Sequence, residues 1–362
     1  MKTTLMFYLN SLHHGGAERV LLELAGRFAA DGYRAVFVTS YTVPDEYPLP
    51  AGVERLTLER VECIHPSPAQ NLERIRKLRR LCREYRPAVL IAFMPAPCLR
   101  AALATRGLPV RLLVSVRNLP EVEYPGKVLR FVGQHILPMA DFCVFQTEQA
   151  RAWFPERLRK KSAVIMNQVA AAFFDTPPAA VRRDIFAVGR LCEQKNHALL
   201  IRAYAALGPV EDRLVIYGEG PLRPELEALI DRLSLRGRVL LPGLSDDIPR
   251  DLGGAKCFVL PSDFEGMPNA LLEAMALGLP CISTDCPCGG PAAVIRDGEN
   301  GLLVPVGDEA ALTARLAALL GDEALRARLS ENARRTAEAF RPARIFARWK
   351  ACVDALIGEA QP

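Results

Sequence analysis

The chain has 362 residues, half of them apolar and about a quarter charged, with 25 Gly and 28 Pro. This length exceeds one ordinary hydrophobic core and predicts two domains of roughly 150 to 200 residues, and the composition excludes a chain dominated by disorder. Because no uncharged apolar stretch reaches the ~18 residues that cross a bilayer, we expect no membrane-spanning helix.

Residues 1–12 carry one Lys and a short apolar run without a small-residue cleavage site, which predicts a first strand and not a signal peptide. Ten Cys are scattered along the chain, as suits a reducing compartment. Cys281, Cys286 and Cys288 cluster, but no second Cys pair or nearby His completes a zinc site, so we expect a plain loop and no metal. These features predict a cytoplasmic protein.

In the first 175 residues, apolar runs of strand length alternate with amphipathic helical stretches. This order predicts a parallel sheet wrapped by helices. The expected strands are 4–9, 35–39, 88–93, 111–116 and 142–146, and the expected helices are 17–30 and 72–85.

The sequence DTPPAA at 175–180 predicts a linker, because its two prolines remove backbone donors. The alternation then restarts with expected strands 184–188, 213–217, 239–241 and 257–260 and expected helices 198–206 and 224–233. We therefore expect an α/β protein with Rossmann-like domains at 1–175 and 176–340, and a C-terminal helix at 341–362 packing back toward the first domain. Two doubly wound parallel sheets facing a central cleft would bind a ligand beyond the carboxyl ends of their strands.

Positive charge is concentrated in the first half of the chain. Residues 1–178 hold 24 Lys and Arg against 16 Asp and Glu, whereas the remainder holds 22 against 25. This asymmetry favours an anionic partner surface. The expected helix 72–85 contains six basic residues, Arg74, Arg76, Lys77, Arg79, Arg80 and Arg83, and either rests on anionic lipid or forms a solvated outer layer.

Residues 261–285, PSDFEGMPNALLEAMALGLPCISTD, carry the most specific pattern. A strand ending near Leu260 leads through a Gly/Pro loop to a helix for which we expect Asn269 as N-cap and Gly278 as C-cap. The amides of Ala270, Leu271 and Leu272 would then be free to bind phosphate. Two carboxylates flank the helix start, Glu265 in the loop and Glu273 in the second turn; alone, each would be an ordinary solvated charge.

This segment resembles the retaining glycosyltransferases of family 4, which have the two-domain GT-B fold and whose hallmark is two Glu in a stretch like EGMPNALLE. The resemblance implies that Glu265 contacts hydroxyls of the donor sugar and that Glu273 holds the ribose of the nucleotide. It also implies that the residues between them line the sugar and diphosphate, namely Gly266, Met267, Pro268, Asn269, Ala270 and Leu271.

Three further segments match the same family, so the resemblance covers nearly the whole chain. In AVGRLCEQKNHALLIRAY at 187–204, Arg190 and Lys195 follow a strand and precede a helix, and the resemblance assigns them to the donor diphosphate. Gly15 and Gly16 follow the first strand, where the backbone can approach a phosphate closely. In the third segment, 217–222 with 241–244, the glycines make only a weak dinucleotide fingerprint, because Arg223 holds the last Gly position. The resemblance instead implies that the nucleotide base lies near Leu244.

One departure concerns the end of a middle strand in the first domain, where many relatives carry His-Asp. This chain has Arg117 and Asn118 there. Arg117 stays protonated and cannot act as a base, so we expect these two residues on the acceptor or phosphate side. His13 and His14 precede the Gly-Gly loop, and an ordinary surface position is the default expectation for both.

The resemblance implies transfer of a sugar from a nucleotide diphosphate sugar, with UDP as the expected nucleotide, to a glycan or polyprenyl-linked acceptor. Arg190, Lys195 and a helix N-terminus can stabilise the departing diphosphate, and the chain has no D-x-D motif, so metal-independent transfer without a cofactor is expected. The resemblance implies retention at the anomeric carbon. Two alternatives stay open: a nucleotide-sugar epimerase on the same fold, and a non-catalytic sugar or nucleic-acid binding module. Basic and aromatic residues are not interleaved for base stacking, which argues against nucleic acid.

Overall fold

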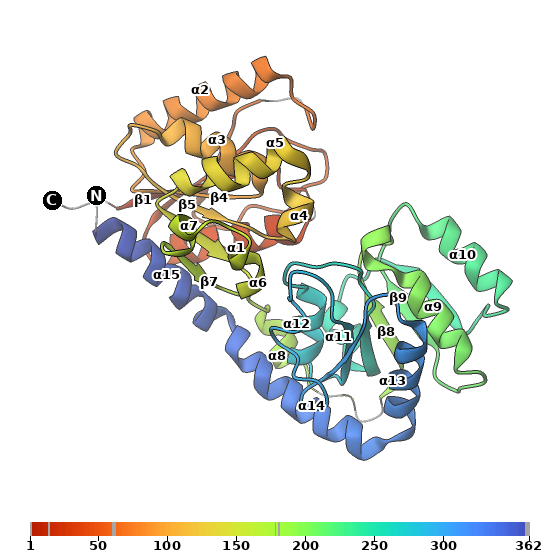
Figure 1. Ribbon diagram of the computed structural model, residues 1–362. Coiled ribbons are helices and arrows are strands. Elements are labelled where there is room, and N and C mark those ends of the chain that lie inside the picture. Colours follow the sequence, from red (N-terminus) through yellow and green to blue (C-terminus); the bar gives the residue numbers. More distant parts are fainter. Residues whose placement is uncertain (1, 14, 60–62, 178, 180–181, 359–362) are drawn as a thin grey trace. The chain divides into compact units, whose positions relative to one another are not determined.

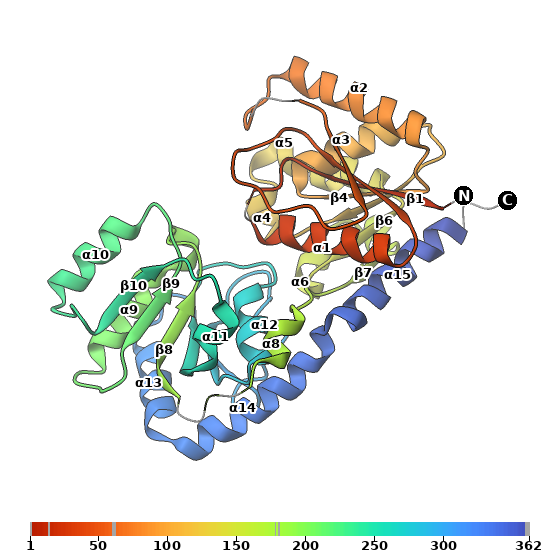
Figure 2. The ribbon, with the colours of Figure 1, turned by 180° about the vertical axis from the view of Figure 1, so that it is seen from behind.

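The computed structural model describes residues 2–13, 15–59, 63–177, 179 and 182–358, which divide into two compact units. Unit 1 comprises Met1–Asn167 and Ile345–Pro362, and unit 2 comprises Gln168–Arg344. Each unit is a parallel sheet with helices packed on it (Figures 1 and 2). The predicted α/β class with two Rossmann-like domains is therefore confirmed.

Unit 1 contains a seven-stranded parallel sheet in the order β3-β2-β1-β4-β5-β6-β7. Its strands are β1 Thr4–Leu9, β2 Arg34–Thr39, β3 Val53–Thr57, β4 Val89–Phe93, β5 Arg111–Ser115, β6 Phe142–Phe145 and β7 Ser162–Val164. The central strands β1 and β4 are almost entirely buried, which explains their continuous apolar sequences. The edge strands β3 and β7 were not predicted, because β3 is mostly half-exposed and mixed in composition and β7 has three residues.

Helices cover both faces of the unit 1 sheet. The long ones are α1 Gly16–Ala30, α2 Pro68–Tyr85 and α3 Pro95–Thr105, and the short ones are α4 Pro120–Glu123, α5 Gly126–Phe131, α6 Glu148–Ala152 and α7 Glu156–Arg159. Between α5 and β6 the chain forms a π-helical turn, η1 Val132–Ile136, and a 3-10 turn, η2 Leu137–Met139. Helix α2 begins four residues earlier than predicted, because Ser67 and Gln70 form a capping box.

Unit 2 contains a six-stranded parallel sheet in the order β10-β9-β8-β11-β12-β13. Its strands are β8 Arg183–Val188, β9 Leu214–Tyr217, β10 Val239–Gly243, β11 Ala255–Leu260, β12 Cys281–Thr284 and β13 Leu302–Val304. Its helices are α8 Ala171–Asp175, α9 His197–Ala206, α10 Arg223–Arg232, α11 Ile248–Gly253, α12 Asn269–Ala276, α13 Glu309–Gly321 and α14 Glu323–Ala337, with 3-10 turns η3 Glu193–Lys195 and η4 Glu338–Phe340. The expected linker follows α8; residues 178 and 180 within it lie outside the described residues.

The C-terminal helix α15, Pro342–Gly358, contributes an apolar stripe to the core of unit 1. Its buried residues Ile345, Trp349, Val353 and Leu356 recur every three or four positions, which places them on one helix face. The Trp349 ring lies 5.6 Å from the Phe93 ring of β4. The end of the chain is therefore an integral part of unit 1.

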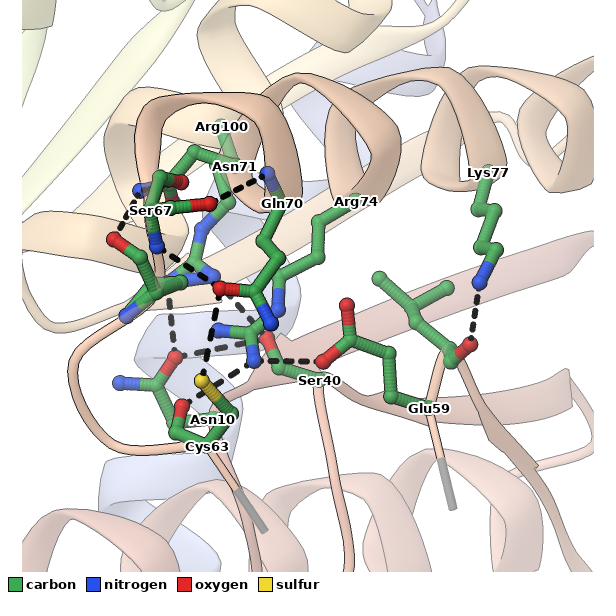
Figure 3. Close-up of polar contacts among 12 residues, drawn as sticks. Asn10, Ser40, Glu59, Cys63, Ser67, Gln70, Asn71, Arg74, Lys77 and Arg100 are labelled. Carbon is green, nitrogen blue, oxygen red and sulfur yellow. Dashed lines mark hydrogen bonds and ion pairs between the residues drawn. The ribbon is translucent and has the colours of Figure 1, made fainter. Parts of the chain in front are cut away.

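The basic helix α2 is only partly a charged surface. Figure 3 shows Arg74 and Lys77 pointing inward: the buried Arg74 guanidinium pairs with Glu59 at 2.6 Å, and Lys77 donates to the Leu58 carbonyl at 3.1 Å. Arg79 donates to the carbonyls of Ala104 and Arg106. Because these three cations hold α2 in place, the two expected alternatives, contact with anionic lipid or a solvated outer layer, apply only to the other basic residues of the helix. The exposed basic residues of this helix are Arg76, Arg80 and Arg83.

A buried polar network lies at the carboxyl end of β5. The Arg117 guanidinium donates to Asn167 and, at 3.5 Å, to the Ser115 hydroxyl, and it lies 4.6 Å from the centre of the Phe93 ring. The Arg117 backbone N–H donates to Glu123 Oε1 at 3.3 Å, while Glu123 Oε2 is buried without a hydrogen-bond partner among the described residues. Burial raises the pKa of the Glu123 carboxyl to about 8, because water no longer solvates its charged form.

Replacing Glu123 with Gln should make the free energy of unfolding depend less on pH. Between the ordinary pKa of 4.5 and the raised value of about 8, folded protein holds a proton that the unfolded chain has released. The free energy of unfolding of the wild type should therefore fall as pH rises across this window, by up to about 1.4 kcal/mol per pH unit. Urea unfolding at a series of pH values measures the slope, with Glu121→Gln on the same short helix as control. Identical slopes for all three proteins would contradict the assignment.

Candidate active site

The unit 2 sheet reverses its strand order between β8 and β11, and the loops after these strands meet there. In open α/β sheets, ligands bind at such a switch point, beyond the carboxyl ends of the strands. The loop after β8 carries Arg190 and Lys195, and the loop after β11 carries Glu265. The structure joins the two loops directly, because Lys195 Nζ lies 2.5 Å from Glu265 Oε1.

Glu265 is held in place by the loops around it. Its side chain is buried, and Oε1 also accepts a hydrogen bond from the Ser262 hydroxyl at 2.7 Å. Gln194 donates to the Phe264 carbonyl at 2.9 Å and, at 3.5 Å, to Glu265 Oε2. A buried carboxylate needs such partners to remain charged. Oε2 therefore accepts weaker hydrogen bonds than Oε1, and it can accept a further hydrogen bond from a hydroxyl.

A second tie joins the same two loops. Asn196 Nδ2 donates to Asp263 Oδ1 at 2.7 Å, and its Oδ1 accepts from the Leu199 N–H at 3.2 Å, capping α9. Asn196 adopts a left-handed conformation, with φ 43°, which Asn tolerates better than most residues. Four residues of these loops were not predicted as site residues: Ser262, Gln194, Asn196 and Asp263. Their only sequence signal is proximity to the motif residues.

Arg190 differs from Lys195 in exposure. Its guanidinium is exposed and makes no hydrogen bond or ion pair within the described part of the chain. A planar guanidinium presents several donors suited to two phosphate oxygens at once. The predicted pair therefore consists of one cation anchored to Glu265 and one that projects into solvent.

Helix α12 begins differently from the prediction. Pro268, and not Asn269, occupies the N-cap position, and no side chain caps the helix there. The N–H groups of Leu271 and Leu272 both donate to the Pro268 carbonyl, at 3.2 and 3.3 Å, so they are not the free amides that were expected. At the other end Leu277 is the C-cap, and Gly278 follows it with φ 66°.

The loop before α12 packs against the segment 285–291. Gly266, Met267 and Pro268 are buried, whereas Asn269 and Ala270 are half-exposed. A Cβ at Gly290 would lie 1.8 Å from the Gly266 carbonyl oxygen, so only glycine fits this position. Burial raises the pKa of the Cys286 thiol to about 12, which keeps it neutral.

Glu273 lies in the second turn of α12, and its side chain is buried. Leu244 directly follows β10 and is 78% exposed, the largest exposed fraction among the large apolar side chains of the described residues. A single exposed Leu is ordinary on a protein surface, so its exposure alone assigns no role to Leu244.

Beside these loops lies a pocket of about 380 Å³. It is lined by Cys192, Glu193, Asn196, His197, Ala198, Leu222, Leu226 and Asp263. Burial lowers the pKa of His197 to about 4, because water no longer solvates its charged form. His197 is therefore neutral near pH 7 and adds no charge here.

In unit 1, the strand order reverses between β1 and β4, and the loop after β1 carries Gly15 and Gly16. Gly15 is the N-cap of α1, and a Cβ there would lie 2.2 Å from Glu18 Oε2. His13 is exposed, and His14 lies outside the described residues. The glycines thus sit where a doubly wound sheet binds ligands.

Arg117 and Asn118 follow β5 in unit 1. The Arg117 side chain is 8% exposed and engaged with Asn167, Ser115 and Phe93, as described above. Asn118 Oδ1 accepts from the Leu119 N–H at 2.8 Å. These contacts favour a structural role for Arg117, in which it holds together the residues at the carboxyl end of β5, over direct contact with a phosphate.

Comparisons with known proteins agree with this geometry. A family model described as "Glycosyl transferase 4-like domain" matches residues 15–167, and one described as "Glycosyl transferases group 1" matches residues 170–336. The chain is 30% identical over 354 residues to the N-acetylgalactosamine-N,N'-diacetylbacillosaminyl-diphospho-undecaprenol 4-alpha-N-acetylgalactosaminyltransferase of Campylobacter jejuni, covering 92% of this chain and 94% of that protein. It is 28% identical to the lipopolysaccharide core biosynthesis glycosyltransferase LpsE of Rhizobium meliloti, covering 89% and 90%.

Solved structures show the same fold. Anabaena HepE in complex with UDP matches with a TM-score of 0.82 at 20% identity, covering 98% of this chain and 100% of that one. Sucrose-phosphate synthase from Thermosynechococcus elongatus matches with a TM-score of 0.86 at 19% identity, covering 99% and 100%. At these identities the likeness concerns the fold alone. Together with the family models and the relative from Campylobacter, it shows that the chain belongs to the glycosyltransferases of the family 4 type, with the GT-B fold.

Proposed function

We propose that this glycosyltransferase moves a sugar from a UDP-sugar to a polyprenyl-diphosphate-linked glycan, with retention at the anomeric carbon and without a metal ion. The observation that carries the proposal is the Lys195–Glu265 ion pair at the switch point of unit 2, with the exposed guanidinium of Arg190 on the same loop as Lys195. This arrangement combines a carboxylate for sugar hydroxyls with two cations for a diphosphate.

Each part of the donor has a matching group in unit 2. Arg190 and Lys195 bind the diphosphate, Glu265 Oε2 accepts from a sugar hydroxyl, and Glu273 accepts from the ribose hydroxyls. Leu244 covers the base. The loop residues Gly266, Met267, Pro268, Asn269, Ala270 and Leu271 line the sugar and diphosphate.

In the transfer step, the bond between the anomeric carbon and the diphosphate oxygen breaks, and the electron pair leaves with UDP. Negative charge grows on the leaving oxygens, and the cations of Arg190 and Lys195 stabilise it more strongly in the transition state than in the ground state. The acceptor hydroxyl attacks from the face that the diphosphate leaves, and its proton passes to a phosphate oxygen. This course retains the anomeric configuration and needs no protein nucleophile.

The acceptor class follows from the relatives and from the charge of unit 1. The Campylobacter relative is named for an undecaprenol diphosphate-linked sugar, and the Rhizobium relative for lipopolysaccharide core biosynthesis. Residues 1–178 carry eight more basic than acidic residues, which suits a diphosphate-bearing lipid in an anionic leaflet. We therefore place the acceptor on unit 1, near Gly15 and Gly16, and the protein at the cytoplasmic face of a membrane.

Replacing Glu273 with Ala should weaken UDP binding and leave the fold intact, because the substitution removes acceptors for the ribose hydroxyls. A loss of about 1.5 to 3 kcal/mol, expected for hydrogen bonds to a charged group, corresponds to a roughly 10- to 150-fold higher Kd. Calorimetric titration with UDP measures it, and Glu225→Ala, at an exposed position of α10, is the matched control. Equal affinity of the Glu273 variant and the wild type would remove the ribose assignment.

Replacing Arg190 with Ala should lower turnover with little loss of stability, since its exposed side chain supports no described contact. Loss of a charge-assisted contact of about 2 to 3 kcal/mol predicts a roughly 30- to 150-fold lower kcat. Arg232→Ala, at an exposed position of α10, is the control. Steady-state rates decide the matter, and wild-type kcat in the Arg190 variant would contradict its role. Lys195→Ala is a less clean test, because it also leaves buried Glu265 without its cation.

Transfer should continue in excess EDTA, because side-chain cations supply the charge that a divalent ion would otherwise bring to the diphosphate. Initial rates with purified protein, measured before and after chelation, should agree within error. Inhibition by EDTA that added Mg²⁺ or Mn²⁺ reverses would show that the reaction depends on a metal. NMR of the product reports in the same assay whether the anomeric configuration is retained.

A further inference from the structure

Helix α5 is an exposed apolar surface in unit 1. None of its six residues is buried, and Val128 and Phe131 are 76% and 57% exposed. Eleven large apolar side chains are exposed in the described part of the chain, and five of them fall within residues 122–139: Val122, Val128, Leu129, Phe131 and Met139. Three of them, Val128, Leu129 and Phe131, lie on the short helix α5 itself, and such a concentration favours an interaction surface over the ordinary scatter of single exposed residues. We call these three residues the α5 patch.

The segment η1, which follows α5, is packed tightly against the rest of unit 1. Gly133 of η1 packs so closely on Trp153 and Tyr124 that a Cβ there would lie 3.1 Å from each ring. Gln134 donates to the Trp153 carbonyl at 2.8 Å, and Arg157 of α7 donates to the Gln134 carbonyl at 2.9 Å. The inner side of the segment is thus fixed to the rest of unit 1. These contacts of η1 therefore fix the orientation in which α5 exposes its apolar side chains.

Basic residues lie on α5 and on the elements packed against η1 and η2. Lys127 and Arg130 alternate with its apolar residues along α5, and Arg130 lies 5.8 Å from the centre of the Trp153 ring. Arg157 of α7 contacts η1, as noted above, and Lys161 reaches the Pro138 carbonyl in η2 at 2.9 Å. Residues 126–161 hold seven Lys and Arg against three Asp and Glu. Exposed apolar side chains that alternate with basic residues on one helix are complementary to a bilayer with anionic headgroups.

Helix α2 does not offer the same combination. Its apolar and cationic residues Leu78, Cys82 and Arg74 face inward (Figure 3 shows Arg74), and Leu72 is its exposed large apolar side chain. The exposed arginines of α2 therefore form a charged surface that includes one exposed large apolar side chain, Leu72, where α5 has three. No helix among the described residues is long and apolar enough to span a membrane, so attachment would have to be peripheral.

We propose that the α5 patch is the membrane-docking surface of this enzyme, inserting Val128, Leu129 and Phe131 among the headgroups of an anionic bilayer while Lys127 and Arg130 contact lipid phosphates. The inference rests on the proposed function in one respect, since a lipid-linked acceptor requires the enzyme to reach a membrane. It deepens that function by assigning attachment to α5 in place of the basic helix α2.

The test is sedimentation of the full chain with vesicles of equal parts phosphatidylglycerol and phosphatidylcholine. Lys127→Gln with Arg130→Gln should lower the partition coefficient about 30-fold, because each basic residue near an anionic leaflet contributes about fivefold. Arg80→Gln with Arg83→Gln removes the same charge from α2 and should leave binding within a factor of two or so of the wild type. Val128→Ser with Phe131→Ser should lower binding about tenfold and abolish the part that resists high salt.

Three results would overturn the proposal. The first is failure of the wild type to bind these vesicles, and the second is an equal loss for the α2 and α5 charge variants. The third is an α5 patch that joins two copies of the chain, seen as a dimer that the serine variant makes monomeric without any change in vesicle binding. All substituted side chains are exposed, so the variants should fold, and thermal unfolding checks this.

Titration with UDP separates failure of this inference from failure of the proposed function. The α5 variants should bind UDP with wild-type affinity, because the donor groups lie in unit 2. Normal UDP binding together with unchanged vesicle binding in the α5 variants would refute only the docking surface. Absence of UDP binding in the wild type would instead refute the donor assignment.

Discussion

The ion pair between Lys195 and Glu265 is the interaction on which the unit 2 site depends. It joins the loops after β8 and β11 at the point where the strand order reverses, and it lies largely out of water. Two charges in such a place are stable only with good geometry and further hydrogen bonds. Ser262 and Gln194 supply those bonds to Glu265, and the Asn196–Asp263 contact ties the same loops a second time. The carboxylate is thereby preorganised for a ligand.

Close backbone approaches make this convergence of loops possible. A Cβ at Gly218 would lie 2.0 Å from the Gly189 carbonyl oxygen, so the loops after β9 and β8 touch backbone to backbone. Gly290 meets the Gly266 carbonyl in the same way beside α12. These glycines let neighbouring loops pack tightly, and the exposed residues that follow the strands of unit 2 include Arg190, Glu219, Leu244 and Asp285.

Arg190 and Arg117 both follow parallel strands, but their packing leaves them with different contacts. Arg190 in unit 2 is exposed and uncommitted among the described residues, whereas Arg117 in unit 1 is enclosed by Phe93, Ser115 and Asn167. The first can turn toward an anion without losing a contact; the second would have to break a buried network. Unit 1 instead presents backbone at Gly15 and Gly16 and apolar surface at α5. The two units therefore offer different chemistry: cations and carboxylates in unit 2, and glycine backbone with an apolar surface that carries basic residues in unit 1.

The sequence by itself determined most of the alternation of strands and helices and the two-sheet architecture, and it singled out the motif residues in the loops after β8 and β11, because apolar periodicity and Gly/Pro punctuation are local properties. It could not reveal the edge strands β3 and β7, which lack a buried face of their own and exist by pairing with distant neighbours. Nor could it tell which charges of α2 face inward, that Pro268 precedes α12 as its cap, or that the apolar residues of α5 remain uncovered. Those features were decided by tertiary structure, since burial and hydrogen-bond partners depend on residues far away in the chain.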